Sequence, residues 1–255
     1  MEDPTDTIEY RGFTIEVHSD SDAQSPREDC EAWGGTMVCW HNRYNLGDEQ
    51  RTDGPRDFMR DLACEVDSAT EQRIDYWESD GYDLRGEAHS DSMIEKAIET
   101  AINKHVVILP LYLYDHSGIT MSTGAFSCPW DSGQVGYIYM TRDQIKRDHG
   151  WMMLTKGRVN KIEGYLKGEV RVYDHFLTGN VYGYQVVDLD GDHLDSCWGY
   201  FGDDYNASGL LESAENAIDC HIASQRKAHF QQLKRWIKSK VPVQFRTPLE
   251  LIYSH

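Results

Sequence analysis

The strongest constraint on this chain is a pair of signals that meet at residue 105. Ser92 and Glu95 form a capping-box pattern, and the residues after Ser92 show helical spacing on one apolar side: Ile94, Ala97, Ile98, Ala101 and Ile102. Residues 106–115, VVILPLYLYD, follow directly as a continuous apolar run typical of a buried strand, in which Pro110 indicates an edge position or a bulge. The sequence therefore predicts a helix over 92–105 that passes straight into a strand.

Other segments extend this mixture of helices and strands. Period-two alternation predicts a strand over 9–18, and we expect it to pair as a hairpin with a long loop with a second predicted strand over 34–41. A further strand is predicted over 135–140. Residues 181–202 predict a second hairpin that turns at Asp190-Gly191. Between residues 115 and 134 the connection is longer than usual, which indicates a functional or internally structured loop.

Helical spacing or capping residues predict helices in four further segments. The predicted helices are 54–73 with Pro55 in its first turn, 142–150 capped by Thr141, 154–179 with a break, and 209–240 with Ser208 as its N-cap. Because helices and strands mix without a regular βαβ order, the fold class is α+β: a mixed, mainly antiparallel sheet with flanking helices and a long C-terminal helix. No linker is evident, so we expect a single domain over 1–255.

Charge divides this domain into three parts. Residues 1–105 hold 26 acidic and 10 basic residues, the aromatic-rich hairpin core 106–205 holds 13 and 8, and the basic-ended helix and tail 206–255 holds 4 and 7. Phosphate binding needs Lys and Arg to replace counterions, so the acidic first part argues against direct nucleic-acid binding. It favours a basic protein partner, although a solvated acidic face that aids solubility explains the same charge.

Several classes of function find no support in the motifs. The sequence has no P-loop, no dinucleotide-binding glycine motif, no HExxH and no GxSxG, and its six cysteines form no CxxC pair. The segment 188–195, DLDGDHLD, has its glycine at the wrong position for a calcium loop. We therefore predict no cofactor and no metal. No apolar window of membrane-spanning length is present and the N-terminus is acidic, so we expect a cytosolic protein.

The loop that follows residue 115 offers one candidate for catalysis. Cys128 as a thiolate, His116 as its base and Asp131 or Asp115 as the orienting group would form the set that a cysteine hydrolase needs. Cys128 precedes Pro129 and then a strand, so no helix N-terminus activates the thiol. Polar side chains in such a loop also satisfy its own backbone, and we therefore commit to no catalytic residue.

Aromatic and acidic residues provide the candidates for partner binding. Tryptophan and tyrosine fill cores and sheet faces, but they also dominate the energetic centres of interfaces. An aromatic surface bordered by carboxylates would suit a basic protein. The predicted binding residues are Trp33, Trp40, Trp130, Asp48, Glu49, Asp53, Asp57, Asp61 and Glu65.

Long motifs at Ser25–Glu49 and Leu109–Met140 resemble a family of uncharacterised proteins carried by bacteriophages, prophages and plasmids. The segments Ser196–Asp204 and Ser208–Asp219 are similar to the C-terminal part of the same family. The resemblance implies an accessory protein of a mobile element, and we expect a non-enzymatic inhibitor of a host defence system, of the anti-CRISPR or anti-restriction type, that mimics DNA in a basic channel. The alternatives are a hydrolase or modifying enzyme that uses Cys128 and His116, and a phage structural or housekeeping protein.

Overall fold

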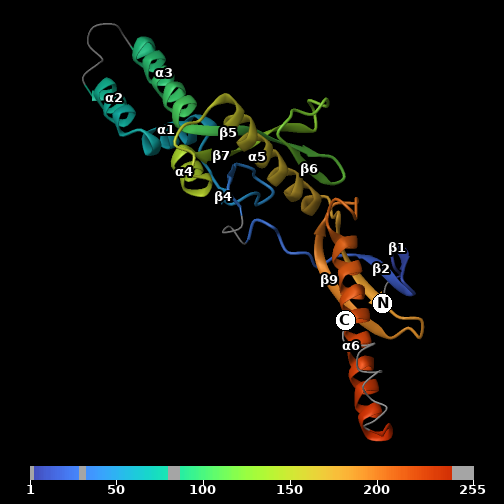
Figure 1. Cartoon of the computed structure of the whole chain (residues 1–255). Coiled ribbons are helices and arrows are strands. Elements are labelled where there is room, and N and C mark those ends of the chain that lie inside the picture. The colour runs from blue at the N-terminus through green and yellow to red at the C-terminus, as the bar shows by residue number, and fades with distance from the viewer. Residues whose placement is uncertain (1–2, 29–32, 80–86, 243–255) are drawn as a thin grey trace. The chain divides into compact units, whose positions relative to one another are not determined.

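The computed structural model of the chain describes residues 3–28, 33–79 and 87–242 (Figure 1). The described residues form an α+β fold, as predicted, with helices beside two sheets that are mainly antiparallel. Contacts divide the chain into two compact units: unit 1 combines Met1–Ala23 with Asn180–His255, and unit 2 is Gln24–Gly179. Whether the two units form the single domain predicted over 1–255 depends on how they associate, so that single domain stays a prediction.

Unit 2 is built on a five-stranded sheet with the order β4-β3-β7-β5-β6. Its longest pair is antiparallel and runs from Val106 opposite Thr141 to Tyr114 opposite Ser132, which confirms the predicted strands on both sides of the long loop. The only parallel pair joins β3 and β4 among the strands described. The bounds are β3 Thr36–Cys39, β4 Glu49–Gln50, β5 Val106–Asp115, β6 Ile119–Ser122 and β7 Ser132–Thr141.

Strand β5 explains both the proline and the long loop. β6 pairs with Tyr112–Asp115, so the earlier half of β5, which includes Pro110, pairs with β7 alone among the described strands. The register also shifts between Leu111 and Tyr112. Pro110 therefore has the edge position next to a bulge that its missing N–H requires. The loop after residue 115 is internally structured, because it contains β6.

Side chains that alternate along the strands give this sheet two covered faces. Val38, Val106 and Tyr139 belong to the apolar cluster under helices α1, α2 and α3. Met37 and Ile138 belong to the cluster that α4 and α5 cover on the other face. The helices are α1 Pro55–Val66, α2 Ser68–Ser79, α3 Glu87–His105, α4 Arg142–His149 and α5 Lys156–Leu177.

Helix boundaries differ from the predictions where local capping competes with periodicity. The helix predicted over 54–73 is two helices, because Asp67 ends α1 and accepts a hydrogen bond from the Thr70 hydroxyl at 2.8 Å in the first turn of α2. The cap predicted at Ser92 is wrong, since α3 already runs from Glu87. The break predicted within 154–179 is also wrong, as α5 is continuous. The capping box at Thr141 is confirmed.

Unit 1 is a four-stranded antiparallel sheet, β1-β2-β8-β9, with α6 packed on one face. Ile15, Val17 and Val186 of the sheet meet Leu210 and Ile218 of the helix in a fully buried cluster. The hairpin predicted over 181–202 is confirmed, including its turn at Asp190-Gly191. The bounds are β1 Asp6–Tyr10, β2 Phe13–Ser19, β8 Val181–Val187, β9 His193–Phe201 and α6 Leu210–Lys240.

Three predictions about unit 1 are wrong. The strand predicted over 9–18 is interrupted by a two-residue turn, in which Arg11 and Gly12 both have positive φ (52° and 84°), as a type I′ hairpin requires. β2 then pairs with β8 rather than with residues 34–41, which contribute β3 to the sheet of unit 2. The N-cap of α6 is Gly209 and not Ser208.

Candidate functional site

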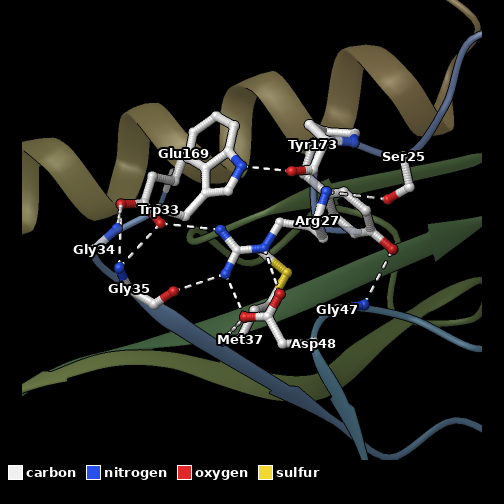
Figure 2. A network of polar contacts seen from close by, with 11 residues as sticks. Ser25, Arg27, Trp33, Gly34, Gly35, Met37, Gly47, Asp48, Glu169 and Tyr173 are labelled. Atoms are coloured by element: carbon white, nitrogen blue, oxygen red, sulfur yellow. Dashed lines mark hydrogen bonds and ion pairs between the residues drawn. The ribbon is translucent and has the colours of Figure 1, made fainter. Parts of the chain in front are cut away.

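A buried guanidinium group lies within unit 2 (Figure 2). The side chain of Arg27 donates from Nε to Asp48 Oδ1 at 2.8 Å, from Nη1 to Glu169 Oε2 at 3.0 Å and from Nη2 to the Gly35 carbonyl at 2.7 Å. Burial by itself would lower the pKa of Arg27, but the hydrogen bonds and charges of Asp48 and then Glu169 outweigh it and raise the pKa. Arg27 therefore stays positively charged and hydrogen-bonds to three segments of the chain, at Gly35, Asp48 and Glu169.

Backbone amides satisfy the remaining oxygens of this network. Met37 N donates to Asp48 Oδ2 at 2.7 Å, and Gly35 N donates to Glu169 Oε1 at 3.2 Å. These bonds help to balance the second carboxylate, which the single guanidinium charge does not neutralise. The network thereby fixes β3 against α5 and holds the segment before β3 in place.

Two of the predicted binding residues belong to this network. Asp48 uses both carboxylate oxygens internally, so a basic partner would have to displace Arg27 to reach it. Trp33 lies with its ring centroid 5.5 Å from the guanidinium carbon of Arg27, and its Nε1 donates to the Pro26 carbonyl. Both side chains therefore contribute to the order of unit 2.

A third predicted residue lies beneath α1. The ring of Trp40 is 5.6 Å from that of Tyr137 and 6.3 Å from that of Phe58, and Phe58 is buried in the cluster that α1 covers. Such edge and tilted contacts are typical of packed aromatic cores. Trp40 therefore anchors α1 on the sheet.

Helix α1 carries three of the six remaining predicted residues. Asp57, Asp61 and Glu65 follow one another at four-residue steps along α1, which places them on one side of that helix, and all three are exposed. Further exposed carboxylates lie on α2 and α3. We name the whole set the acidic helical layer: Asp57, Asp61, Glu65, Glu71, Asp75, Glu78, Asp91, Glu95 and Glu99.

Arginine pairs neutralise only part of the acidic helical layer. Three arginines form four ion pairs here: Arg51 with Asp53 and Asp61, Arg56 with Glu95, and Arg60 with Glu78. The hydrogen bonds from Arg51 lower the pKa of Asp53. Glu49, Asp57 and Glu65 are exposed and form no ion pair with any residue that the structure describes. Their charges therefore face solvent.

An apolar groove of about 480 Å³ lies between α1 and α3 within this layer. Its apolar lining comes from Met59, Ile98, Ile102, Ile108 and Tyr137. Glu95 and Glu99 of the acidic helical layer also line it, together with Arg56. An apolar depression bordered by carboxylates has the composition that receives an apolar anchor flanked by Lys or Arg.

The long loop brings the candidate catalytic residues together, but in an unexpected order. The Cys128 thiol lies 3.6 Å from Asp131 Oδ2, and His116 Nδ1 lies 3.5 Å from that same oxygen. Asp131 therefore stands between the thiol and the imidazole, whereas a nucleophilic triad needs the imidazole in the middle. The Asp115 carboxylate instead forms an ion pair with Arg43, with Oδ2 and Nη1 3.0 Å apart.

Trp130 occupies the same loop and is the most exposed large apolar side chain described, at 92%. Trp33 and Trp40, by contrast, are partly buried and pack against Arg27 and the cluster under α1. The three predicted tryptophans therefore do not form a single aromatic surface.

Several residues that build these sites escape sequence reasoning. Arg27 and Glu169 are 142 positions apart, and no local pattern links them. The apolar groove combines residues of α1, α3, β5 and β7, whose proximity depends on the sheet order. The Gly34-Gly35 pair is the one available signal, since glycine often marks a close approach of the backbone to another group.

Comparison with protein-family models, with curated protein sequences and with solved structures finds no match to this chain. None of the helices in the described ranges is long and apolar enough to cross a membrane.

Proposed function

We propose that this chain is a non-enzymatic binding protein that engages a basic protein surface through helices α1–α3 of unit 2. The observation that carries the proposal is the apolar groove between α1 and α3 together with the acidic helical layer around it. The carboxylates would steer a basic partner toward the groove, and the groove would bind an apolar side chain of that partner.

The sequence resemblance supports the biological setting of this proposal. Its long motifs are similar to those of phage, prophage and plasmid proteins, and acidic proteins of such elements can occupy the basic channels of host nucleases. We infer an accessory protein of a mobile element that inhibits a host defence system of the anti-CRISPR or anti-restriction type. It would act in the host cytosol on a nucleic-acid-binding protein.

The distribution of charged residues between the two units narrows the proposed binding surface to one part of the chain. Unit 1 holds 17 acidic and 8 basic residues and unit 2 holds 26 and 17, so each unit has a net charge of −9. The acidic first 105 residues are divided between the units, because residues 1–23 belong to unit 1. The proposal therefore rests on the acidic helical layer of unit 2 rather than on the whole N-terminal sequence.

Variants that neutralise this layer test the proposal. Asp57→Asn, Glu65→Gln and Glu99→Gln in one protein remove three exposed charges of the acidic helical layer, among them Glu99 of the groove lining, without a change of side-chain length. The control variant Asp22→Asn, Asp190→Asn, Asp203→Asn changes the net charge equally, on exposed residues of unit 1. Each protein is expressed in cells that carry one restriction or CRISPR system and are then challenged with phage.

We expect the original chain and the control variant to remove protection by one of the systems, and the first variant to leave it largely intact. Binding of the purified host complex should weaken at least about tenfold in the first variant, since three charge contacts contribute about 0.5–1 kcal/mol each. If both variants act like the original chain in a system that the chain disables, the acidic helical layer is not the binding surface.

A further inference from the structure

The last helix of unit 1 continues well beyond the sheet on which it packs. Leu210, Ala214 and Ile218 are fully buried against the sheet. Contact with the strands ends near the β1–β2 turn, where Arg11 Nη1 pairs with Asp219 Oδ1 at 2.8 Å. Residues 223–240 follow as 18 further helical residues, a length of about 27 Å. Residues 223–232 are exposed without exception, so we name 223–240 the projecting helix.

The charge of α6 changes sign where the helix leaves the sheet. Asp219 is the last acidic residue of the helix, and no Asp or Glu occurs from Cys220 to Lys240. Six basic residues take their place, and all six are exposed: Arg226, Lys227, Lys234, Arg235, Lys238 and Lys240. None of them forms an ion pair with a carboxylate in the part of the chain that the structure describes.

Helical spacing arranges these cations on one side. Lys227, Gln231, Lys234 and Lys238 are separated by four, three and four positions, which places them along one stripe of an α-helix. Arg226 and Arg235 border the stripe. The stripe contains no apolar side chain.

Two simpler explanations account for only part of this pattern. Cations stabilise the C-terminal end of a helix, but the effect is limited to the last turn, and Lys227 lies more than three turns before the end. Solubility does not require the cations either, because the chain has a net charge of −18 and added cations bring it closer to zero.

The rest of unit 1 has the opposite charge. Residues 1–23 and 180–219 contain 16 acidic residues and a single basic one, Arg11. Interactions between exposed charges are screened over about 8 Å at physiological salt. A helix that projects about 27 Å therefore presents most of its cations beyond the reach of these carboxylates.

We propose that the projecting helix binds the phosphate backbone of nucleic acid. A phosphate backbone needs a row of cations and no apolar contact, which is the composition of the stripe. A protein partner would require apolar anchors at the centre of the contact, and a lipid surface would require an exposed apolar side next to the cations. The projecting helix exposes two large apolar side chains, Phe230 at 42% and Trp236 at 57%. Phe230 lies beside the stripe and Trp236 on the opposite side of the helix, so together they form neither an apolar centre nor a continuous apolar side.

This site is independent of the acidic helical layer, since it lies in the other unit. The acidic residues that disfavour direct nucleic-acid contact lie within 1–105, and the projecting helix lies outside that range. Because backbone cations read no bases, we expect binding to be independent of nucleotide sequence.

Fluorescence anisotropy of the full chain with a labelled duplex DNA of about 20 base pairs tests the proposal, titrated at 50 mM and 200 mM NaCl. If five or six cations contact phosphates, the affinity should fall about 500- to 2,000-fold between the two salt concentrations. The variant Lys227→Gln, Lys234→Gln, Lys238→Gln should bind at least about tenfold more weakly at 50 mM. Its slope of log K against log salt should be smaller by about 2.7, at about 0.9 per phosphate contact.

The control variant Lys146→Gln, Lys161→Gln, Lys167→Gln removes three exposed lysines of unit 2 and should bind like the original chain. Circular dichroism should show equal helix content in all three proteins, since Gln has nearly the helix propensity of Lys. The proposal is overturned if no binding occurs at 50 mM NaCl, if the stripe variant binds as tightly as the control, or if polyglutamate or vesicles with phosphatidylserine compete as effectively as unlabelled DNA.

Discussion

Arg27 Nη1 and Glu169 Oε2 are 3.0 Å apart, although 142 positions of sequence separate the two residues. Both side chains are largely buried, with 2% of Arg27 and 11% of Glu169 exposed. A buried ion pair of this kind owes its stability to complete pairing, because removal of one partner leaves a charge without water or a counter-charge. The pair therefore stabilises the packing of β3 against α5 in unit 2.

Substitution of Arg27 by Met should strongly destabilise unit 2. The change leaves the Asp48 and Glu169 carboxylates without their cation, and we expect the free energy of unfolding to fall by about 3–5 kcal/mol. Arg43→Met is the matched control: its side chain is 70% exposed and pairs with Asp115, so the expected loss is below about 1 kcal/mol. Urea denaturation followed by tryptophan fluorescence measures both, and equal losses would contradict a structural role for the network.

Cysteine reactivity should follow burial. Desolvation by burial, with a further contribution from the charge of Asp48, raises the pKa of Cys39 to about 12, whereas Cys197 and Cys220 are exposed. At pH 8 the thiolate fraction of Cys39 is then about 10⁻⁴, so iodoacetamide should modify it at least about 10³-fold more slowly than an exposed cysteine. Mass spectrometry of digested samples gives each rate, and rapid modification of Cys39 in the folded protein would show that its pocket opens.

The same thiol makes stability depend on alkaline pH. The pKa of Cys39 is higher in the folded chain than in the unfolded chain. The contribution of the protonated thiol to the free energy of unfolding is therefore fully present below about pH 9. That contribution should be lost as the pH rises toward 12, because the unfolded chain releases the proton first. A Cys39→Ala variant should show a weaker decline in unfolding midpoint between pH 9 and 11 than the original chain, and identical declines would assign the effect to other groups.

Short-range signals account for the parts of the fold that the sequence predicts correctly. Pro55 begins α1, Thr141 caps α4, and Asp190-Gly191 turns the β8–β9 hairpin, because each depends on residues within four positions of itself. The strand at 106–115 is recognisable because it is buried on both faces.

Long-range pairing accounts for the errors. The Arg11-Gly12 turn lacks the Asn or Asp that usually marks a tight hairpin, so β1 and β2 look like one strand in the sequence. Nothing local directs β2 to β8, about 170 positions later, rather than to β3. Long-range contacts also explain the errors at the site. In the sequence Asp48 and Trp33 look like surface residues, but in the structure both contact the buried Arg27.

Replacement of Cys128 distinguishes the binding protein from the hydrolase. Both Cys128 and His116 contact Asp131, and the thiol has no helix N-terminus behind it, so we expect Cys128→Ser to retain anti-defence function within about twofold. His116→Ala should behave in the same way. The phage challenge measures both variants beside the original chain. A loss of two orders of magnitude in both, with unchanged thermal unfolding, would instead support covalent catalysis by the thiol.

Two glycines of β7 should respond in opposite ways to the same substitution. A Cβ at Gly136 would lie 2.2 Å from the Val38 carbonyl oxygen, which is backbone of the paired strand β3 and cannot rotate away. A Cβ at Gly133 would meet no atom within 4 Å. We therefore expect Gly136→Ala to destabilise unit 2 by about 1–3 kcal/mol or more, because β3 must shift, and Gly133→Ala to be neutral or slightly stabilising.

Thermal unfolding and amide hydrogen exchange check this pair of variants. In Gly136→Ala the amides that bond across β3 and β7 should exchange faster, whereas those of the β5–β7 pair should change less. Displacement of β3 should also loosen Arg27, since Gly35 and Met37 lie in or next to that strand and belong to its network. A Gly136→Ala protein as stable as Gly133→Ala would mean that β3 does not lie on β7 in the register described.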